Sequence, residues 1–346
     1  MRTHRWLCIV GGVVAVGVSS SAAVAQLLGT VLQSSFVGPI TNAPVPFTIY
    51  LPQGYEASTE RLPVIYHLHG LEGTHNGPQI SAVPASYEAA RAAGLIGPAI
   101  IVFPDGYGDS FWADSARSNK PAETNIVREL IPHVDATYRT RAHRGGRAIT
   151  GFSMGGLSTP TYLAKFPDVF SVSVQYDGSM ATWDIVRSVR PDIAAEIYDN
   201  SEARFNLYSP WRWTQQNAAV LASSSAMRII VGGEASGLSS NRAFRAHLLG
   251  VGITPEYVET GLPHNLPLLL QAQGANSWAF IQRHLSPPDP ACPADFNRDG
   301  GVDGADVEAF FAAWEAAEPD ADVNQDGGID GGDVGGFFEA WQAGGC

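Results

Sequence analysis

Cysteine and basic residues are scarce in this chain, and each shortage excludes one class of protein. Only three of its 346 residues are cysteines, so the fold does not rest on a disulfide framework. Lysine and arginine total 21 against 34 aspartates and glutamates, which excludes a basic surface for nucleic acid. A hydrophobic content of 45% nevertheless provides for a sizeable core, enough for one large domain and a smaller one.

Membrane-spanning length is also lacking. The apolar run from Leu7 to Val18 follows Arg2 and Arg5 and precedes an Ala-x-Ala cleavage site that ends at Ala25. This order is typical of a secretion signal, whereas a membrane anchor, the alternative, needs a longer run. We therefore expect a secreted protein, extracellular, at the cell surface or periplasmic, with no membrane span in the mature chain.

The acidity is confined to the C-terminal part of the chain. Residues 287–346 contain fourteen acidic residues and one arginine, whereas acids and bases balance in the remainder. Cys292 and Cys346 bracket this tail, and in an oxidising compartment such a pair is expected to form one disulfide. The proline-rich stretch before it is typical of a stiff linker. The predicted organisation is a signal peptide at 1–25, an α/β domain at 26–285, a linker at 286–291 and a small acidic domain at 292–346.

The acidic tail contains an internal repeat. A twelve-residue segment beginning at Asp295 recurs at Asp322, an offset of 27 residues, and apolar residues at helical spacing follow each copy. Both copies carry oxygen-bearing side chains at positions one, three, five, nine and twelve and glycine at six, the pattern of a calcium loop. We expect two structural Ca²⁺ ions. The expected ligands are Asp295, Asn297, Asp299, Gly301, Asp303 and Asp306 in one loop and Asp322, Asn324, Asp326, Gly328, Asp330 and Asp333 in the other.

These two loop–helix units resemble a dockerin, and the ending Gly345-Cys346 is similar to the dockerin-like tails of some environmental bacteria. The resemblance covers residues 292–346. It implies a small all-α calcium-binding module that joins the protein to a cohesin-like or cell-surface partner. In dockerins, positions ten and eleven of each loop help to recognise the cohesin; here they are Gly304-Ala305 and Gly331-Gly332, which offer little side chain to a partner.

Between Gln26 and Leu285, apolar strands alternate with helices. Leu62–Leu68 and Ala99–Phe103 are expected to be buried strands, and Glu123–Tyr138 is expected to be a helix. Alternation of this kind predicts an α/β fold with a mostly parallel sheet and helices on both faces.

Gly151-Phe152-Ser153-Met154-Gly155 matches the G-x-S-x-G nucleophile elbow and lies between a predicted strand and a predicted helix. Ser153 is therefore the expected nucleophile. It requires a base, an acid that orients the base, and donors for the oxyanion. His264 is the expected base, because it follows the last predicted strand. Glu234 is the preferred acid and Asp177 its rival, since each follows a strand in the chain order that α/β-hydrolases use. No cofactor is expected for the catalysis.

The backbone N–H groups of Leu71 and Met154 are the expected oxyanion donors. His69, in the same loop as Leu71, is expected mainly to orient that loop. An aromatic-rich insertion between Gly178 and Asn217 either caps the site or forms a small separate core. Candidates for substrate contact are His69, Trp112, Trp183 and Trp211.

The α/β domain resembles the putative-esterase family, which includes esterase D, feruloyl and acetyl-xylan esterases and the mycolyltransferase antigens. The resemblance implies an α/β-hydrolase fold and metal-independent serine carboxylester hydrolysis. The chain departs from the family pattern at Glu234, where aspartate is common, and after His264. The residues that carry the resemblance are His69-Gly70-Leu71, Phe111-Trp112-Ala113-Asp114-Ser115, Glu129-Leu130-Ile131-Pro132, Gly151-Phe152-Ser153-Met154-Gly155-Gly156, Phe166-Pro167-Asp168-Val169-Phe170 and His264.

Three functions are consistent with this sequence. The first is a secreted serine esterase that removes acyl groups, such as acetyl or feruloyl, from a polysaccharide and is tethered to a partner by its calcium-binding tail. The second is an acyltransferase to a sugar, or a thioester hydrolase, of the same fold. The third is a non-catalytic adhesion or assembly protein, which would have no need to keep Ser153 and His264.

Overall fold

The structure, a computed structural model, describes residues 29–233, 235–285, 293–297, 302–318, 321–324 and 326–342. The predicted signal peptide, the linker and the predicted disulfide between Cys292 and Cys346 lie outside these residues. In the described part of the chain, eight strands form one sheet in the order β1-β2-β4-β3-β5-β6-β7-β8. The strands are β1 (Thr30–Val37), β2 (Pro44–Leu51), β3 (Val64–Leu68), β4 (Ile100–Pro104), β5 (Arg147–Phe152), β6 (Val172–Tyr176), β7 (Ala226–Val231) and β8 (Glu256–Glu259).

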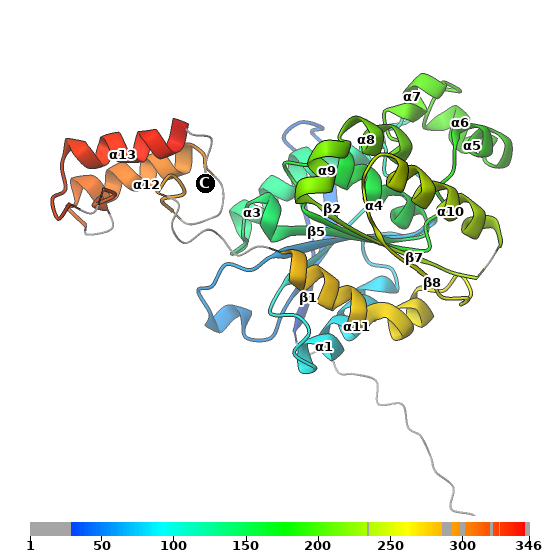
Figure 1. The fold of residues 1–346 in the computed structure, drawn as a ribbon, viewed down its shortest axis with the longest axis horizontal. Coiled ribbons are helices and arrows are strands. Elements are labelled where there is room, and N and C mark those ends of the chain that lie inside the picture. Colours follow the sequence, from blue (N-terminus) through cyan, green and yellow to red (C-terminus); the bar gives the residue numbers. More distant parts are fainter. Residues whose placement is uncertain are drawn as a thin grey trace, which may run out of the picture.

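The sheet is parallel except at one edge. Six strands, β4, β3, β5, β6, β7 and β8, run parallel to one another (Figure 1). Strand β2 pairs antiparallel with β4 on one side and with β1 on the other. The expected mostly parallel α/β sheet is confirmed. Because parallel strands end at the same edge, the segments that follow β3, β5, β6, β7 and β8 meet there.

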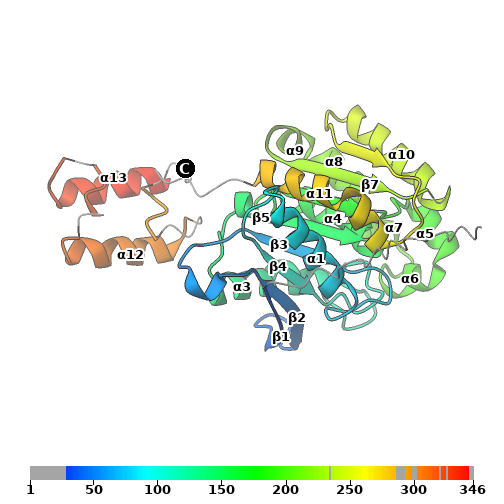
Figure 2. The same cartoon turned by 90° about the horizontal axis from the view of Figure 1, so that it is seen from below.

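Both faces of the sheet are buried. In β3, Val64, Tyr66 and Leu68 belong to one hydrophobic cluster, whereas Ile65 between them belongs to the other. This follows from the two-residue period of a strand, and apolar residues at every position require helices on both faces. Helices α1 and α11 cover one face and α3, α4, α8 and α10 the other (Figures 1 and 2).

The described helices connect the strands or extend beyond them. A π-helical stretch, Asn125–Leu130, joins α2 to α3, so residues 122–137 form the long helix that the sequence predicts. The helices are α1 (Gln79–Ala92), α2 (Ala122–Thr124), α3 (Ile131–Thr137), α4 (Met154–Lys165), α5 (Trp183–Val189), α6 (Pro191–Glu196), α7 (Glu202–Asn206), α8 (Pro210–Gln216), α9 (Ala218–Ser224), α10 (Ala235–Gly250), α11 (Leu266–His284), α12 (Gly304–Glu315) and α13 (Gly331–Gln342). None of these helices is long and apolar enough to cross a membrane.

Five short helices, α5 to α9, fill the connection between β6 and β7. Their first part has a small hydrophobic cluster of its own, which includes Val186, Ile193, Ile197, Tyr198 and Phe205. The first part of the aromatic-rich insertion therefore forms a small core of its own, whereas Trp211 and Trp213 pack against the main core. Helices α5 to α7 stand at one end of the sheet (Figure 1).

The sequence repeat of the tail appears as a structural repeat. Helices α12 and α13 follow the two acidic loops, and Phe310 and Phe337, equivalent positions of the repeat, stack with ring centroids 4.4 Å apart. Both phenylalanines are fully buried in a cluster that belongs to this helix pair. The described part of the tail is thus helical and has its own small core.

Candidate active site

Ser153 lies on the sharp turn between β5 and α4. Its backbone has φ 56° and ψ −117°, a conformation that residues other than glycine rarely adopt. Gly151 and Gly155 make the turn possible: a Cβ on Gly151 would lie 2.6 Å from the carbonyl carbon of Gly155, and a Cβ on Gly155 would collide with the backbone of Leu68. The two glycines allow strand and helix to cross closely, which is the geometry of a nucleophile elbow.

His264 connects Ser153 to a carboxylate. Its Nε2 lies 2.9 Å from Oγ of Ser153, and its Nδ1 lies 2.6 Å from Oδ2 of Asp177. The three residues follow β5, β6 and β8, so they meet at one edge of the sheet although they lie far apart in the chain. The ring of Phe152 stacks on the imidazole with centroids 4.6 Å apart and restricts its tilt.

Asp177 is held so that it faces His264. The residue is buried, and its second carboxylate oxygen, Oδ1, accepts the backbone N–H of Gly232 at 2.7 Å. An ionised carboxylate can only accept, so Nδ1 of His264 carries the hydrogen. Nε2 of the neutral imidazole is then the acceptor that faces the hydroxyl of Ser153, the arrangement that a general base requires.

Among the described residues, the rival acid of the sequence prediction lies against His264. Asp177, the rival, is the carboxylate that contacts His264. Glu234, the preferred acid, lies outside the described residues. Both follow parallel strands that end at the same edge, and sequence order alone does not say which carboxylate reaches the imidazole. Asp177 follows β6, which lies directly beside β5, the strand that carries Ser153, and this position favours Asp177 as the acid.

The loop after β3 approaches Ser153 closely. A Cβ on Gly70 would lie 3.2 Å from Cβ of Ser153, and the next residue, Leu71, lines the same cavity as Ser153 and Met154. A tight turn in which the N–H of Gly73 donates to the carbonyl of Gly70 fixes this loop. The two predicted oxyanion donors, Leu71 and Met154, therefore line the same cavity as Ser153.

His69 braces this loop and does not line the cavity. Its Nδ1 lies 2.8 Å from the carbonyl oxygen of Gly70, and the backbone N–H of Gly106 donates to its Nε2 at 2.9 Å. Burial lowers the pKa of His69, so the ring stays neutral. A neutral ring with one N–H and one acceptor satisfies both contacts at once.

The tryptophans proposed for substrate contact pack elsewhere. Trp112 is buried, and its Nε1–H donates to the carbonyl of His69. Trp183 contacts Tyr198 and Phe205 in the separate core of the insertion, and Trp211 packs on Phe244. The described residues that line the cavity beside Ser153 include none of these three tryptophans, because their rings serve as packing.

A cavity of about 320 Å³ opens beside Ser153 and His264. Side chains that sequence reasoning did not single out for substrate contact line it: Phe111, Ile185, Val189 and Arg190. Of these, Phe111 alone belongs to a motif that carries the family resemblance. The only other signal was the apolar pair at 185 and 189, one helical turn apart on α5, a helix too short to predict with precision.

Two carboxylates of the tail loops accept hydrogen bonds from backbone N–H groups. Asp306 and Asp333, position twelve of the two loops, are fully buried, and each accepts two backbone N–H groups. Asp299 and Gly301 lie outside the described residues. Across the described ranges, no three His, Cys, Asp or Glu side chains are grouped in a way that would hold a metal ion. The donor set itself, carboxylate and amide oxygens, is of the kind that Ca²⁺ prefers.

Comparison with known proteins places these residues in a family context. The family model described as "putative esterase" matches residues 38–234. The chain is 32% identical over 134 residues to an esterase of Mycobacterium tuberculosis, a match that covers 38% of this chain and 28% of that protein. It is 30% identical over 149 residues to an endo-1,4-beta-xylanase/feruloyl esterase of Xylanibacter ruminicola, covering 41% of this chain and 20% of that protein. The chain thus spans less than a third of the length of either relative.

Solved structures share the fold. A ferulic acid esterase superposes with a TM-score of 0.64 at 21% identity, covering 75% of this chain and 99% of that one. An S-formylglutathione hydrolase from Agrobacterium tumefaciens superposes with a TM-score of 0.63 at 17% identity, covering 75% of this chain and 97% of that one. At such identities these structures are similar in fold alone.

Proposed function

The chain belongs to the putative esterase family, and we propose that it is a serine carboxylic-ester hydrolase in which Ser153, His264 and Asp177 form the catalytic triad. The single observation that carries this proposal is the unbroken series of contacts from Ser153 Oγ through His264 to Asp177. The strained backbone of Ser153 supports it, because such strain gathers at functional sites.

The geometry supports a two-step acyl transfer. Ser153 Oγ attacks the ester carbonyl carbon while its proton passes to Nε2 of His264, and the carboxylate of Asp177 stabilises the imidazolium that results. The negative charge on the carbonyl oxygen is stabilised by the N–H groups of Leu71 and Met154. When the tetrahedral intermediate collapses, the C–O bond to the alcohol breaks and His264 gives the alcohol its proton. Water then repeats the attack on the acyl-enzyme, with His264 as the base, and releases the acid.

For the biological substrate, we propose an acylated polysaccharide outside the cell. The predicted signal peptide supports secretion, and a relative of this chain is named as a xylanase and feruloyl esterase. The tail would hold two Ca²⁺ ions through the loop residues named above and tether the enzyme to a partner at the cell surface.

Two other functions remain as alternatives. Acyl transfer to a sugar, or thioester hydrolysis, uses the same triad with another acceptor or leaving group. A non-catalytic assembly protein is disfavoured by the intact contacts of Ser153, since nothing in adhesion requires them.

A fluorophosphonate probe tests the proposed function directly. The wild-type protein should be labelled at Ser153 and should hydrolyse para-nitrophenyl acetate, whereas Ser153→Ala should be neither labelled nor active. Ser179→Ala is the matched control and should keep both properties, because Ser179 lines the same cavity but does not lie on the turn between β5 and α4. Labelling that survives in Ser153→Ala would refute the serine mechanism.

A further inference from the structure

The cavity beside Ser153 has apolar walls from three segments of the chain. Leu71 comes from the loop after β3, Leu157 from α4, and Ile185 and Val189 from α5. Its volume of about 320 Å³ lies at the lower end of the roughly 300–1,000 Å³ that small-molecule sites occupy. An acetyl group on Ser153 would fill only a small part of such a space.

The mouth of this cavity is apolar and exposed. Leu71 is 39% exposed, Ile185 41% and Val189 69%, although large apolar side chains gain free energy when they leave water. All three residues line the same cavity as Ser153. Exposed apolar side chains gathered around a site are typical of a surface that a ligand covers.

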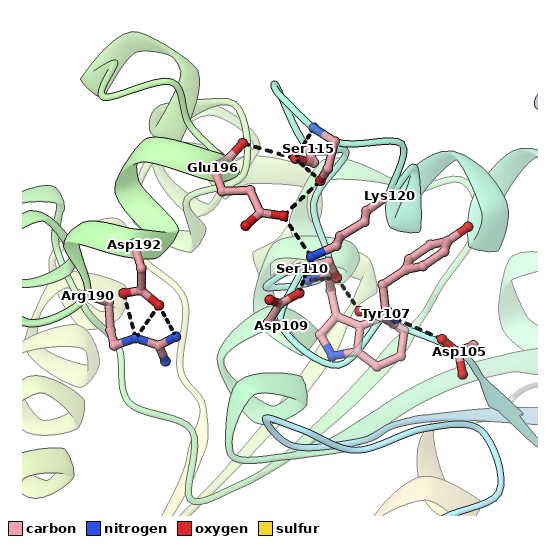
Figure 3. A network of polar contacts seen from close by, with 12 residues as sticks. Asp105, Tyr107, Asp109, Ser110, Ser115, Lys120, Arg190, Asp192 and Glu196 are labelled. Atoms are coloured by element: carbon pink, nitrogen blue, oxygen red, sulfur yellow. Dashed lines mark hydrogen bonds and ion pairs between the residues drawn. The ribbon is translucent and has the colours of Figure 1, made fainter.

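Arg190, the cation in this lining, is already paired. Its Nε and Nη2 bind the two carboxylate oxygens of Asp192 at 3.0 and 2.6 Å (Figure 3). Its guanidinium also lies over the ring of Phe111. The charges of Asp109 and Glu72 also act on it. Arg190 is therefore a weak anchor for an anionic substrate.

Polar contacts hold the end of α6, the helix that follows α5. Nζ of Lys120 lies 2.7 Å from a carboxylate oxygen of Asp109 and 2.7 Å from one of Glu196, at the end of α6, which follows α5 directly (Figure 3). Ser115 Oγ donates to the carbonyl of Glu196, and Ser118 Oγ donates to its side chain. These contacts fasten the end of α6 to the loop of residues 109–120, and α5 precedes α6 with one residue between them.

We propose that α5 selects the acyl group of the substrate: Ile185 and Val189 contact the outer part of an apolar acyl group larger than acetyl, alkyl or aryl, and Lys120 is a positioning residue for this wall. The proposal rests on the serine-esterase function given above. The acyl group is assigned to the cavity because it becomes bonded to Ser153 in the first half of the reaction and stays there until water releases it in the second. A sugar alcohol would leave its hydroxyls without partners against Leu71, Ile185 and Val189.

The role of Ile185 and Val189 can be tested with esters that share the same leaving group and differ in the acyl group. We compare kcat/KM for the para-nitrophenyl esters of acetic, hexanoic and cinnamic acid in wild type, in Ile185→Ala/Val189→Ala, and in the control Val220→Ala. Val220 is an exposed apolar residue on α9 that does not line the cavity. The double variant should lose about tenfold on hexanoate and cinnamate and less than about twofold on acetate. Loss on only one of the two larger esters identifies the acyl group as alkyl or aryl.

Three results overturn the proposal. One is an equal loss on acetate and hexanoate in the double variant, and another is a wild-type preference for acetate. The third is a preference for the para-nitrophenyl monoester of adipic acid, which has the length of hexanoate but ends in a carboxylate, since Arg190 would then be the selecting residue. If wild type hydrolyses none of these esters and the fluorophosphonate does not label Ser153, the proposed function fails as well.

The positioning role of Lys120 has its own readout. Lys120→Met should raise KM for hexanoate severalfold and leave kcat and the rates on acetate unchanged, and Lys120→Arg should restore KM. Arg117→Met is the control, because Arg117 lies in the same loop but is 56% exposed and pairs with Asp199, which lies beyond the end of α6. A fall of kcat on all esters in Lys120→Met would contradict a role confined to the wall.

Discussion

Asp177 Oδ2 lies 2.6 Å from His264 Nδ1 although 87 residues separate the two in the chain. The contact depends on two parallel strands, β6 and β8, that end at the same edge with β7 between them. The identity of the acid is therefore a property of the sheet order and not of any local motif.

Asp177→Asn should reduce kcat by up to about 10⁴-fold, because an amide no longer fixes the Nδ1–H tautomer or stabilises the imidazolium. Glu234→Gln should have a small effect. Steady-state hydrolysis of para-nitrophenyl esters by both variants decides between the two acids. A severe loss in Glu234→Gln together with a mild one in Asp177→Asn would return the role to Glu234.

Ser153→Gly should be inactive but more stable than wild type, by about 1 kcal/mol. Glycine adopts φ 56° without the strain that serine bears at this turn. Ser153→Ala should be equally inactive without this gain, because alanine keeps the Cβ. Chemical denaturation of the three proteins measures the difference, and equal midpoints for the two variants would show that the turn stores no strain.

His69→Ala should lower kcat about tenfold to hundredfold and leave KM nearly unchanged. The imidazole bridges the carbonyl of Gly70 and the N–H of Gly106, so its loss frees the loop that presents the N–H of Leu71 to the oxyanion. His75→Ala, a change to a histidine nearby that pairs with Asp105, is the control. A loss confined to KM would instead indicate that His69 acts on substrate binding.

Glu123 should make stability depend on pH. It is nearly buried against Lys165, and burial raises the pKa of its carboxyl to about 7. A carboxyl whose folded pKa exceeds its unfolded one stabilises the fold fully below the unfolded pKa, and this contribution is lost as pH rises towards 7. Relative to Glu123→Gln, wild type should therefore lose up to about 3 kcal/mol between pH 4 and 8. Parallel curves of unfolding free energy against pH for the two proteins would contradict this.

The full-length protein should bind two Ca²⁺ ions, and Asp326→Ala should bind one, as isothermal titration calorimetry would measure. Glu339→Ala, on the exposed side of α13, is the control and should bind two. Chelation with EDTA should leave ester hydrolysis unchanged within about twofold, because the triad needs no metal and the tail has a separate core. Absence of any heat at millimolar Ca²⁺ would remove the calcium proposal and leave the esterase proposal untouched.

Sequence patterns anticipated the centre of the fold better than its margins. The buried strands β3 to β7 and the turn at Ser153 follow from apolar runs and one motif. Strand β1 escaped notice because it is an edge strand with mixed polar and apolar residues, and its pairing with β2 is a tertiary effect. An amphipathic pattern predicts a helix over residues 275–285, whereas α11 begins at Leu266, because Asn265 caps it and Pro267 suits its first turn.

The site was predictable where chain order determines it. Ser153 and His264 were chosen from a motif and from their place after a strand, and the structure brings them within hydrogen-bonding distance. The wall formed by Ile185 and Val189 was not predictable, because its position depends on how a helix of seven residues packs on the remainder of the insertion. The tryptophans of the same insertion were misjudged for the same reason, since residue type alone does not say which ring faces inward.

His264 follows β8, the outermost strand, which has four residues and pairs with β7 alone. Edge strands with half-exposed residues are among the first parts of a sheet to open, whereas Ser153 follows a central strand with neighbours on both sides. Partial opening at this edge would separate the base from the nucleophile while most of the sheet stays intact. Enzymatic activity therefore depends on the local stability of this edge of the sheet. During denaturation, activity should disappear before the tryptophan fluorescence of the core changes.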